Sequence, residues 1–180
     1  MKARYLFVAL TLLSANNFLH AGEKTAPCSS TLPSPIRRYV DAKYIGWNLA
    51  SCEMLNQTEK ERFKPLLRDN CYGAIRGHFT NEGTSYALYL LRPLGNGYEN
   101  QLVVLQEGET GITRHVLVPA SFTASAVVLR KLPPGTSIID ANTGKHFLPK
   151  HDVISLFDPD KGEVNFFWKA GKFISVSISE

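Results

Sequence analysis

The spacing of hydrophobic residues is helical in the first part of this chain and strand-like afterwards. Ile36 and Val40 lie on one face of a segment that begins at Ser34 with a proline next to it, and Gly46 follows the segment. Proline is common at the first helical position, and glycine commonly ends a helix. We therefore expect a first helix with one apolar face between residues 35 and 44.

A second, shorter helix is expected to begin at Thr58. Thr58 and Glu61 have the spacing of a capping box, and Phe63 supplies an apolar side. Pro65 limits this helix, because proline removes a backbone donor and clashes with the preceding turn. The tripeptide NQT, which ends at Thr58, is also an acceptor pattern for glycosylation, but the capping role explains the threonine without a sugar.

Beyond the second helix, apolar residues alternate with a period of two, which is typical of strands. Residues 86–91 are apolar in both alternating sets, so we expect a central strand there. Further strands are expected at 102–105, 112–118, 126–129, 138–139, 153–157, 164–168 and 173–178. The expected fold class is α+β, with one or two N-terminal helices packed on a mainly antiparallel sheet of about seven or eight strands and a C-terminal meander.

The N-terminus has the layout of a secretory signal peptide. Lys2 and Arg4 precede an apolar run at residues 5–13, which is shorter than the about 20 residues of a membrane span. We expect cleavage after Ala21, with Ala15 as a second candidate. The predicted organisation is a signal peptide at 1–21, a flexible leader at 22–34 and a single α+β domain at 35–180. The predicted location is periplasmic or secreted, with no stable membrane anchor after cleavage.

The charge of the chain is modest once the predicted signal peptide is removed. The formal net charge is +4, and residues 1–21 carry two cations and no acidic residue, so the remainder carries +2. No cluster of Lys and Arg is longer than two residues. Because nucleic-acid binding needs a concentrated basic face, we expect no nucleic-acid partner.

Three cysteines remain after the predicted cleavage, at Cys28, Cys52 and Cys71. Oxidising compartments favour disulfides. Cys52 and Cys71 flank one polar segment, and we expect them to pair, which would stabilise the fold by roughly 3 kcal/mol on the chain-entropy estimate. Cys28 would then be a free thiol or a partner in exchange.

The stretch GHFTNEGTSYALYLL has the outline of a calcium loop. The ligand positions would be His78, Thr80, Glu82 and Ser85, with Gly83 at the sharp turn. Only Glu82 is an anion, whereas calcium usually needs several oxygens and more than one carboxylate. We therefore favour a strand–turn–strand in which Gly83 adopts a positive φ, and expect no cofactor.

Two segments, CYGAIRGHFTNEGTSYALYLL and HDVISLFDPDKGEVNFFWKAGKF, resemble small exported bacterial proteins of undefined function. In those proteins a loop similar to the FG-GAP-like calcium motif of integrin-type repeats precedes an aromatic strand. This chain departs from the pattern at Tyr72, where they have proline, and at His78, Glu82 and Ser85, where they have Asp or Thr. The resemblance implies kinship of fold and export, and it implies no reaction.

Other chemical sites have weak signals in the sequence. His146 and His151 bracket a proline without a third partner, so solvated histidines are favoured over a zinc site, which needs three or four ligands. No Gly-x-Ser-x-Gly elbow and no glycine-rich phosphate loop occur. Phe166 and Trp168 share one face of a strand and form a candidate binding patch, although aromatic residues more often fill a core.

These observations leave three hypotheses for function. The first is an exported, non-enzymatic binding domain whose partner is a protein or another component of the cell envelope. The second is a periplasmic immunity or inhibitor protein directed against a toxin or hydrolase. The third is a hydrolase without a recognisable motif. An open groove with converging polar groups would favour an enzyme.

Overall fold

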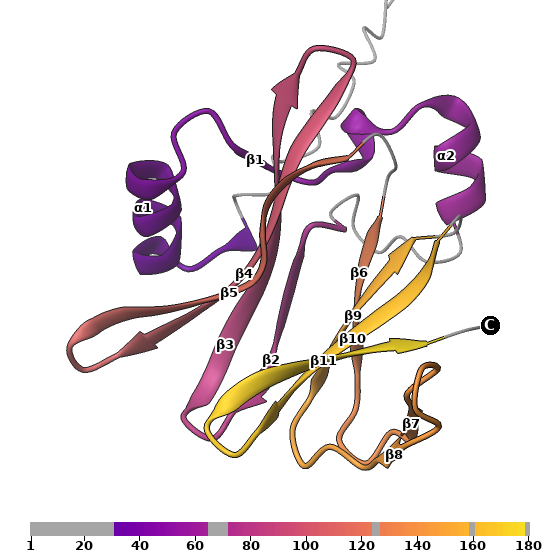
Figure 1. Ribbon diagram of the computed structural model, residues 1–180. Coiled ribbons are helices and arrows are strands. Elements are labelled where there is room, and N and C mark those ends of the chain that lie inside the picture. Colours follow the sequence, from indigo (N-terminus) through magenta and orange to yellow (C-terminus); the bar gives the residue numbers. More distant parts are fainter. Residues whose placement is uncertain (1–30, 65–71, 124–126, 159–160, 179–180) are drawn as a thin grey trace, which may run out of the picture.

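The computed structural model describes residues 31–64, 72–123, 127–158 and 161–178 (Figure 1). The predicted signal peptide and most of the predicted leader lie outside these ranges. The helical segments are α1 (Ser34–Lys43), a short 3-10 turn (Cys52–Met54) and α2 (Gln57–Phe63). The strands are β1 (Asn48–Leu49), β2 (Ala74–Thr80), β3 (Gly83–Leu94), β4 (Gly97–Gly108), β5 (Gly111–Thr123), β6 (Val128–Leu132), β7 (Ile138–Ile139), β8 (His146–Phe147), β9 (Val153–Asp158), β10 (Gly162–Lys169) and β11 (Lys172–Ile178).

The strands are divided between two sheets and a ribbon. The larger sheet has the order β1-β3-β4-β5, with β2 also paired to β3, and the smaller sheet has the order β11-β10-β9-β6. β7 and β8 form a separate two-stranded ribbon, and all of these pairs are antiparallel. The predicted α+β fold with one sheet of seven or eight strands is therefore wrong. Alternation identifies the strands but not their partners, and β6 pairs with the distant β9.

Residues of both sheets share the largest buried cluster. On β3, Ala87 and Tyr89 face this cluster. Leu88 and Leu90, which alternate with them, face the opposite side of the larger sheet. Ile154 of β9 belongs to the same cluster as Ala87. The alternation explains why both faces of β3 are apolar, and it confirms the prediction of a central strand.

Helix α1 covers the outer face of the larger sheet. Figure 1 shows α1 beside this sheet, and Ile36 and Val40 are buried there in one cluster with Leu88 and Leu90. The helix predicted from their spacing is confirmed, and it begins at Ser34, one residue before the expected position. Leu32, in the predicted leader, is 4% exposed in the same cluster.

Helix α2 begins earlier than expected, so the predicted cap at Thr58 is wrong. Asn56 is the N-cap: its Oδ1 accepts from the backbone N–H of Glu59 at 2.9 Å, and its own N–H donates to Glu59 Oε2 at 2.8 Å. Both Asn56 and Thr58 are followed three residues later by glutamate, and asparagine caps at least as well as threonine. Phe63 buries the apolar side of α2 in the cluster between the sheets.

The outer face of the smaller sheet is covered by the β7–β8 ribbon. Ile138 of β7 is buried with Val153 and Phe167, and Phe147 of β8 packs on this cluster. The rings of Phe147 and Phe167 have centroids 5.3 Å apart. The molecule therefore has four layers in sequence: α1, the larger sheet, the smaller sheet and the ribbon. The three strands of the C-terminal meander do pair in chain order, within the smaller sheet.

Candidate functional site

The stretch that resembles a calcium loop is the β2–β3 hairpin. Thr80 pairs with Gly83 across a two-residue turn, and Gly83 has a φ of 100°. The preferred interpretation of a strand–turn–strand with a positive φ at Gly83 is confirmed. His78 lies on β2 with an exposed side chain, and Ser85 is buried on β3.

The polar side chains of this hairpin are used in hydrogen bonds within the protein. The Thr80 hydroxyl donates to Gln106 Oε1 at 2.9 Å and accepts from the backbone N–H of Glu82 at 3.2 Å. Gln106 in turn donates to the Glu82 carbonyl at 2.6 Å, and the Ser85 hydroxyl is 3.5 Å from the Gly77 carbonyl. In the ranges that the structure describes, no group of three or more His, Cys, Asp or Glu side chains is placed to hold a metal ion.

Asp152 joins this hairpin to the smaller sheet. Its Oδ2 accepts from the backbone N–H of His78 at 2.8 Å, and its own N–H donates to the His78 carbonyl at 3.1 Å. A Cβ at Gly77 would lie 2.6 Å from the Phe79 ring and 2.9 Å from Asp152 Oδ2, so only glycine permits this close approach. The contact holds the hairpin next to the segment that precedes β9.

A cleft of about 430 Å³ lies beside this contact and is partly open to solvent. It is lined by residues 146–151, by residues 167–171 at the β10–β11 turn, and by Asn81 of the β2–β3 turn. Three chain segments that are distant in sequence therefore meet here. A volume in the range of about 300–1,000 Å³ is typical of small-molecule sites.

The charged side chains at the cleft are cationic. Among the described residues that line it are Lys150 and Lys169, and none of these residues carries a carboxylate. The ammonium groups of Lys145 and Lys169 lie 5.4 and 5.2 Å from the ring centroid of Phe147, within cation–π range. No ion pair joins these three lysines to a carboxylate within the described ranges.

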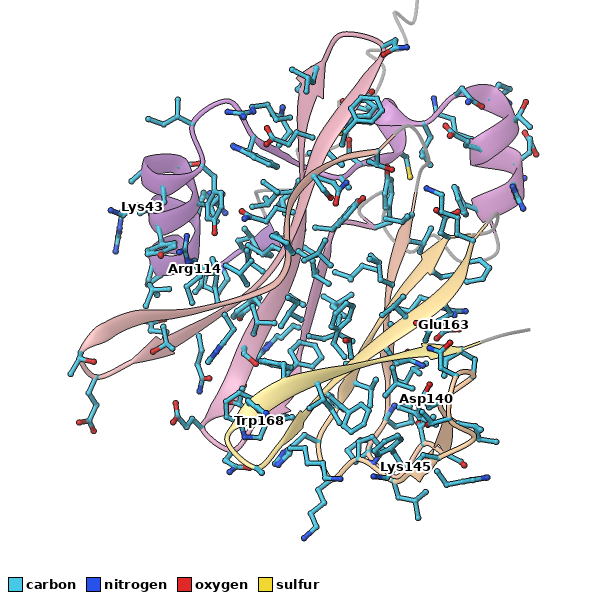
Figure 2. All side chains as sticks on the ribbon, in the orientation of Figure 1. Lys43, Arg114, Asp140, Lys145, Glu163 and Trp168 are labelled. Carbon is cyan, nitrogen blue, oxygen red and sulfur yellow. The ribbon has the colours of Figure 1, made fainter. Side chains whose placement is uncertain are left out.

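Asp140 lies near Lys145 (Figure 2), but its carboxylate accepts hydrogen bonds from residues of its own turn. Its carboxylate accepts from the Asn142 backbone N–H at 2.9 Å and from the Thr143 hydroxyl at 2.8 Å. These hydrogen bonds, the one to Asn142 first, lower the pKa of Asp140. The Asp140 N–H donates to the Lys145 carbonyl at 3.0 Å, so this turn fixes the backbone of Lys145.

Trp168 forms one wall of the cleft and is held by two other rings. Its centroid lies 5.4 Å from that of His115 and 5.0 Å from that of Phe173, both in edge-to-face arrangements. Burial lowers the pKa of His115, and the nearby Glu82 acts in the opposite direction. Because three strands, β5, β10 and β11, hold this ring cluster, the position of Trp168 is fixed before any ligand arrives.

The structure separates the two residues of the predicted aromatic patch. Trp168 is half-buried and lines the cleft, whereas Phe166 is 5% exposed and belongs to the core between the sheets. His146 and His151, expected to be solvated, both line the cleft. Sequence reasoning missed the lysines. A signal for them existed in the turns LPKH and WKAGK, where lysines adjoin His151 and Trp168.

The predicted disulfide involves one residue that the structure describes. Cys52 is half-buried in the 3-10 turn, and burial raises the pKa of its thiol. Cys28 and Cys71 lie outside the described ranges. The pairing of Cys52 with Cys71 therefore stays a prediction.

Comparison with family models, with curated proteins and with solved structures finds no match. The resemblance to exported proteins with an FG-GAP-like loop therefore stays a prediction. Among the helices of the described ranges, none is both long and apolar enough to cross a membrane.

Proposed function

We propose that this chain is an exported, non-enzymatic binding domain, and that its cleft binds an anionic component of the cell envelope. One observation carries the proposal: Lys150 and Lys169 line a cleft with aromatic walls, Lys145 contacts its Phe147 wall, and the described residues of the lining include no carboxylate. All three lysines are exposed, and ammonium groups that gather at a cleft without an ion pair in the described ranges attract anions to it. Export is inferred from the signal-peptide pattern at residues 1–21.

The size of the cleft favours a small envelope component over a partner protein. A stable protein interface buries about 800 Å² on each partner, whereas a cleft of about 430 Å³ has the size of a small-molecule site. The aromatic walls at Phe147 and Trp168 offer apolar contact, while Asn81 and the two histidines offer hydrogen bonds. An anionic saccharide combines all three kinds of contact.

Binding to a panel of acidic and neutral saccharides tests this proposal. We expect the purified chain to retain acidic saccharides and not their neutral counterparts. The double variant Lys145→Ala/Lys169→Ala should lose this binding, because it removes both ammonium groups next to Phe147. Lys43→Ala is the matched control, since Lys43 lies on α1 far from the cleft (Figure 2).

Two outcomes would overturn the proposal. One is equal binding of acidic and neutral saccharides, and the other is acidic binding that the double variant retains. Export is tested separately, by cell fractionation and N-terminal sequencing. We expect a mature protein in the periplasm or medium that begins at Gly22, and a cytoplasmic protein that retains Met1 would contradict export.

A further inference from the structure

Two lysines from different segments of the chain make cation–π contacts with the same ring, that of Phe147. Lys145 precedes β8, and Lys169 ends β10. Their Nζ atoms lie 5.4 and 5.2 Å from the centroid of Phe147, so they are at most 10.6 Å apart, the total of the two distances. A phosphate that accepts one hydrogen bond from each side spans roughly 8 Å between two donors. Both lysines are exposed, so their side chains can swing toward one bound group.

The ring that organises the two lysines is itself fixed. Phe147 pairs with Ile138 in the ribbon, and its ring packs at 5.3 Å against Phe167, which is 2% exposed. The quadrupole of an aromatic ring favours cations over its face. Phe147 thus attracts both ammonium groups to one position beside the cleft.

The charge at this position indicates a ligand with more than one negative charge. Lys150, which lines the cleft with Lys169, adds a third cation near this position, and the carboxylate of Asp140 is turned toward Asn142 and Thr143. One carboxylate would leave at least one of the paired charges uncompensated. A phosphomonoester carries about −1.5 to −2 charges at neutral pH and has three acceptor oxygens.

The type of cation agrees with phosphate. No arginine is found among the described residues that line the cleft. Arginine binds both carboxylate and phosphate through two parallel hydrogen bonds, and lysine binds phosphate as a point charge whose direction is free, so a site built of lysines is compatible with phosphate. Two lysines that approach from separate segments, the residue before β8 and the end of β10, can each contact a different oxygen of one phosphate group.

We propose that Lys145 and Lys169 together bind one phosphomonoester group, carried by an envelope saccharide or by a lipid headgroup. This inference rests on the proposed function, because it names the anion that the cleft receives. The remaining walls, formed by Trp168 and residues 148–151, would contact the body of the ligand that carries the phosphate.

Calorimetry with four soluble probes tests the proposal. The probes are glucose 1-phosphate, inorganic phosphate, glucuronate and glucose, each titrated into the purified full chain. We expect glucose 1-phosphate to bind at least about tenfold more tightly than glucuronate, inorganic phosphate to compete with it, and glucose not to bind. Glucuronate that binds as tightly as glucose 1-phosphate would overturn the phosphate inference while leaving the proposed function intact. Failure of both anions to bind would overturn both.

Single variants locate the phosphate. Lys145→Gln and Lys169→Gln should each weaken binding of glucose 1-phosphate by about tenfold or more, because each removes one charge-assisted contact. Lys172→Gln is the matched control: Lys172 pairs with Lys169 across the same hairpin and is exposed, whereas the cation–π contacts to Phe147 come from Lys145 and Lys169. Equal weakening by Lys172→Gln would contradict the assignment, since it would indicate a diffuse charge effect.

Vesicles distinguish the two sources of the phosphate. Vesicles that contain phosphatidic acid present a phosphomonoester, and those that contain phosphatidylglycerol present a phosphodiester with a single charge. Sedimentation with the first kind only, lost in Lys169→Gln, supports a lipid headgroup. Binding of glucose 1-phosphate without sedimentation supports a phosphorylated saccharide. Equal sedimentation with both kinds of vesicle, retained in Lys169→Gln, would contradict a phosphomonoester site.

Discussion

Replacing Asp152 by alanine should destabilise the join between the two sheets. Asp152 is 8% exposed, and its Oδ2 accepts from the His78 N–H at 2.8 Å. A hydrogen bond to a charged group contributes about 1.5–3 kcal/mol, and the substitution leaves the His78 N–H without this acceptor. We expect the free energy of unfolding of Asp152→Ala to fall by about 2 kcal/mol. For a domain of this size, Tm should fall by about 4–8 °C.

A graded series makes this test specific to the carboxylate. Asp152→Asn keeps an oxygen acceptor and loses the charge, so it should cost about half as much as alanine, or about 1 kcal/mol. Asp41→Ala is the control, because Asp41 is exposed on α1 and should change stability by less than about 0.5 kcal/mol. The backbone hydrogen bond from Asp152 to His78 remains in every variant.

Urea unfolding, followed by fluorescence and by circular dichroism, measures the change in the free energy of unfolding for Asp152→Ala, Asp152→Asn and Asp41→Ala. The two probes should give the same midpoint if unfolding is two-state. Asp152→Ala with a stability within about 0.5 kcal/mol of the parent chain would refute the reasoning, since the hydrogen bond would then contribute nothing to the join. So would an Asp152→Asn variant that is less stable than Asp152→Ala.

Three further predictions concern the turn beside the cleft, the half-buried His115 and the cysteines. Ala170 has a φ of 51°, which asparagine tolerates better, so Ala170→Asn should raise stability by about 0.5–1 kcal/mol in urea unfolding; a loss would show that the turn is not strained. Burial lowers the pKa of His115, so the unfolded chain takes up the proton first and stability should fall as pH drops below 6.5. The fall in Tm between pH 7.5 and 5 should be smaller in His115→Gln, and an unchanged or larger fall would contradict this sign. Non-reducing peptide mapping should recover a Cys52–Cys71 peptide, and a bridge from Cys28 to either residue would overturn the pairing.

Local signals in the sequence predicted the elements better than their arrangement. The spacing of Ile36 and Val40 predicted α1, and the apolar character of both faces predicted the central position of β3. Gly83 predicted the hairpin turn, because a positive φ is a property of a few adjacent residues. These features depend on neighbours in sequence, which is why the pattern shows them.

The division into two sheets depends on contacts between distant residues. Val128 pairs with Phe157 across an interval that contains the whole β7–β8 ribbon. No local pattern indicates this partner, so the single-sheet prediction failed. The capping error at Thr58 has a different cause: two overlapping capping boxes fit the sequence, and the structure uses the one at Asn56.

The cleft could not be predicted for the same reason as the sheets. Residues 146–168, which are 23 residues, separate Lys145 from Lys169 in the sequence. Only the packing of the ribbon on β10 brings both lysines to Phe147. Trp168 was identified as a candidate from its aromatic strand, whereas its neighbour in that patch, Phe166, proved to face the core. Strand alternation placed Phe166 and Trp168 on one face of β10. It does not indicate that the larger sheet buries Phe166 on this face whereas Trp168 reaches the cleft.

An NMR titration of the isotope-labelled chain tests the central claim most directly. Glucuronate, glucose 1-phosphate and glucose would be added in turn while the backbone amide signals are followed. If the cleft binds an anionic envelope component, at least one of the two anions will give saturable shifts at residues 146–151 and 168–171, and glucose will give none. Shifts confined to α1 or β5, or no saturable shift with either anion, would contradict the account.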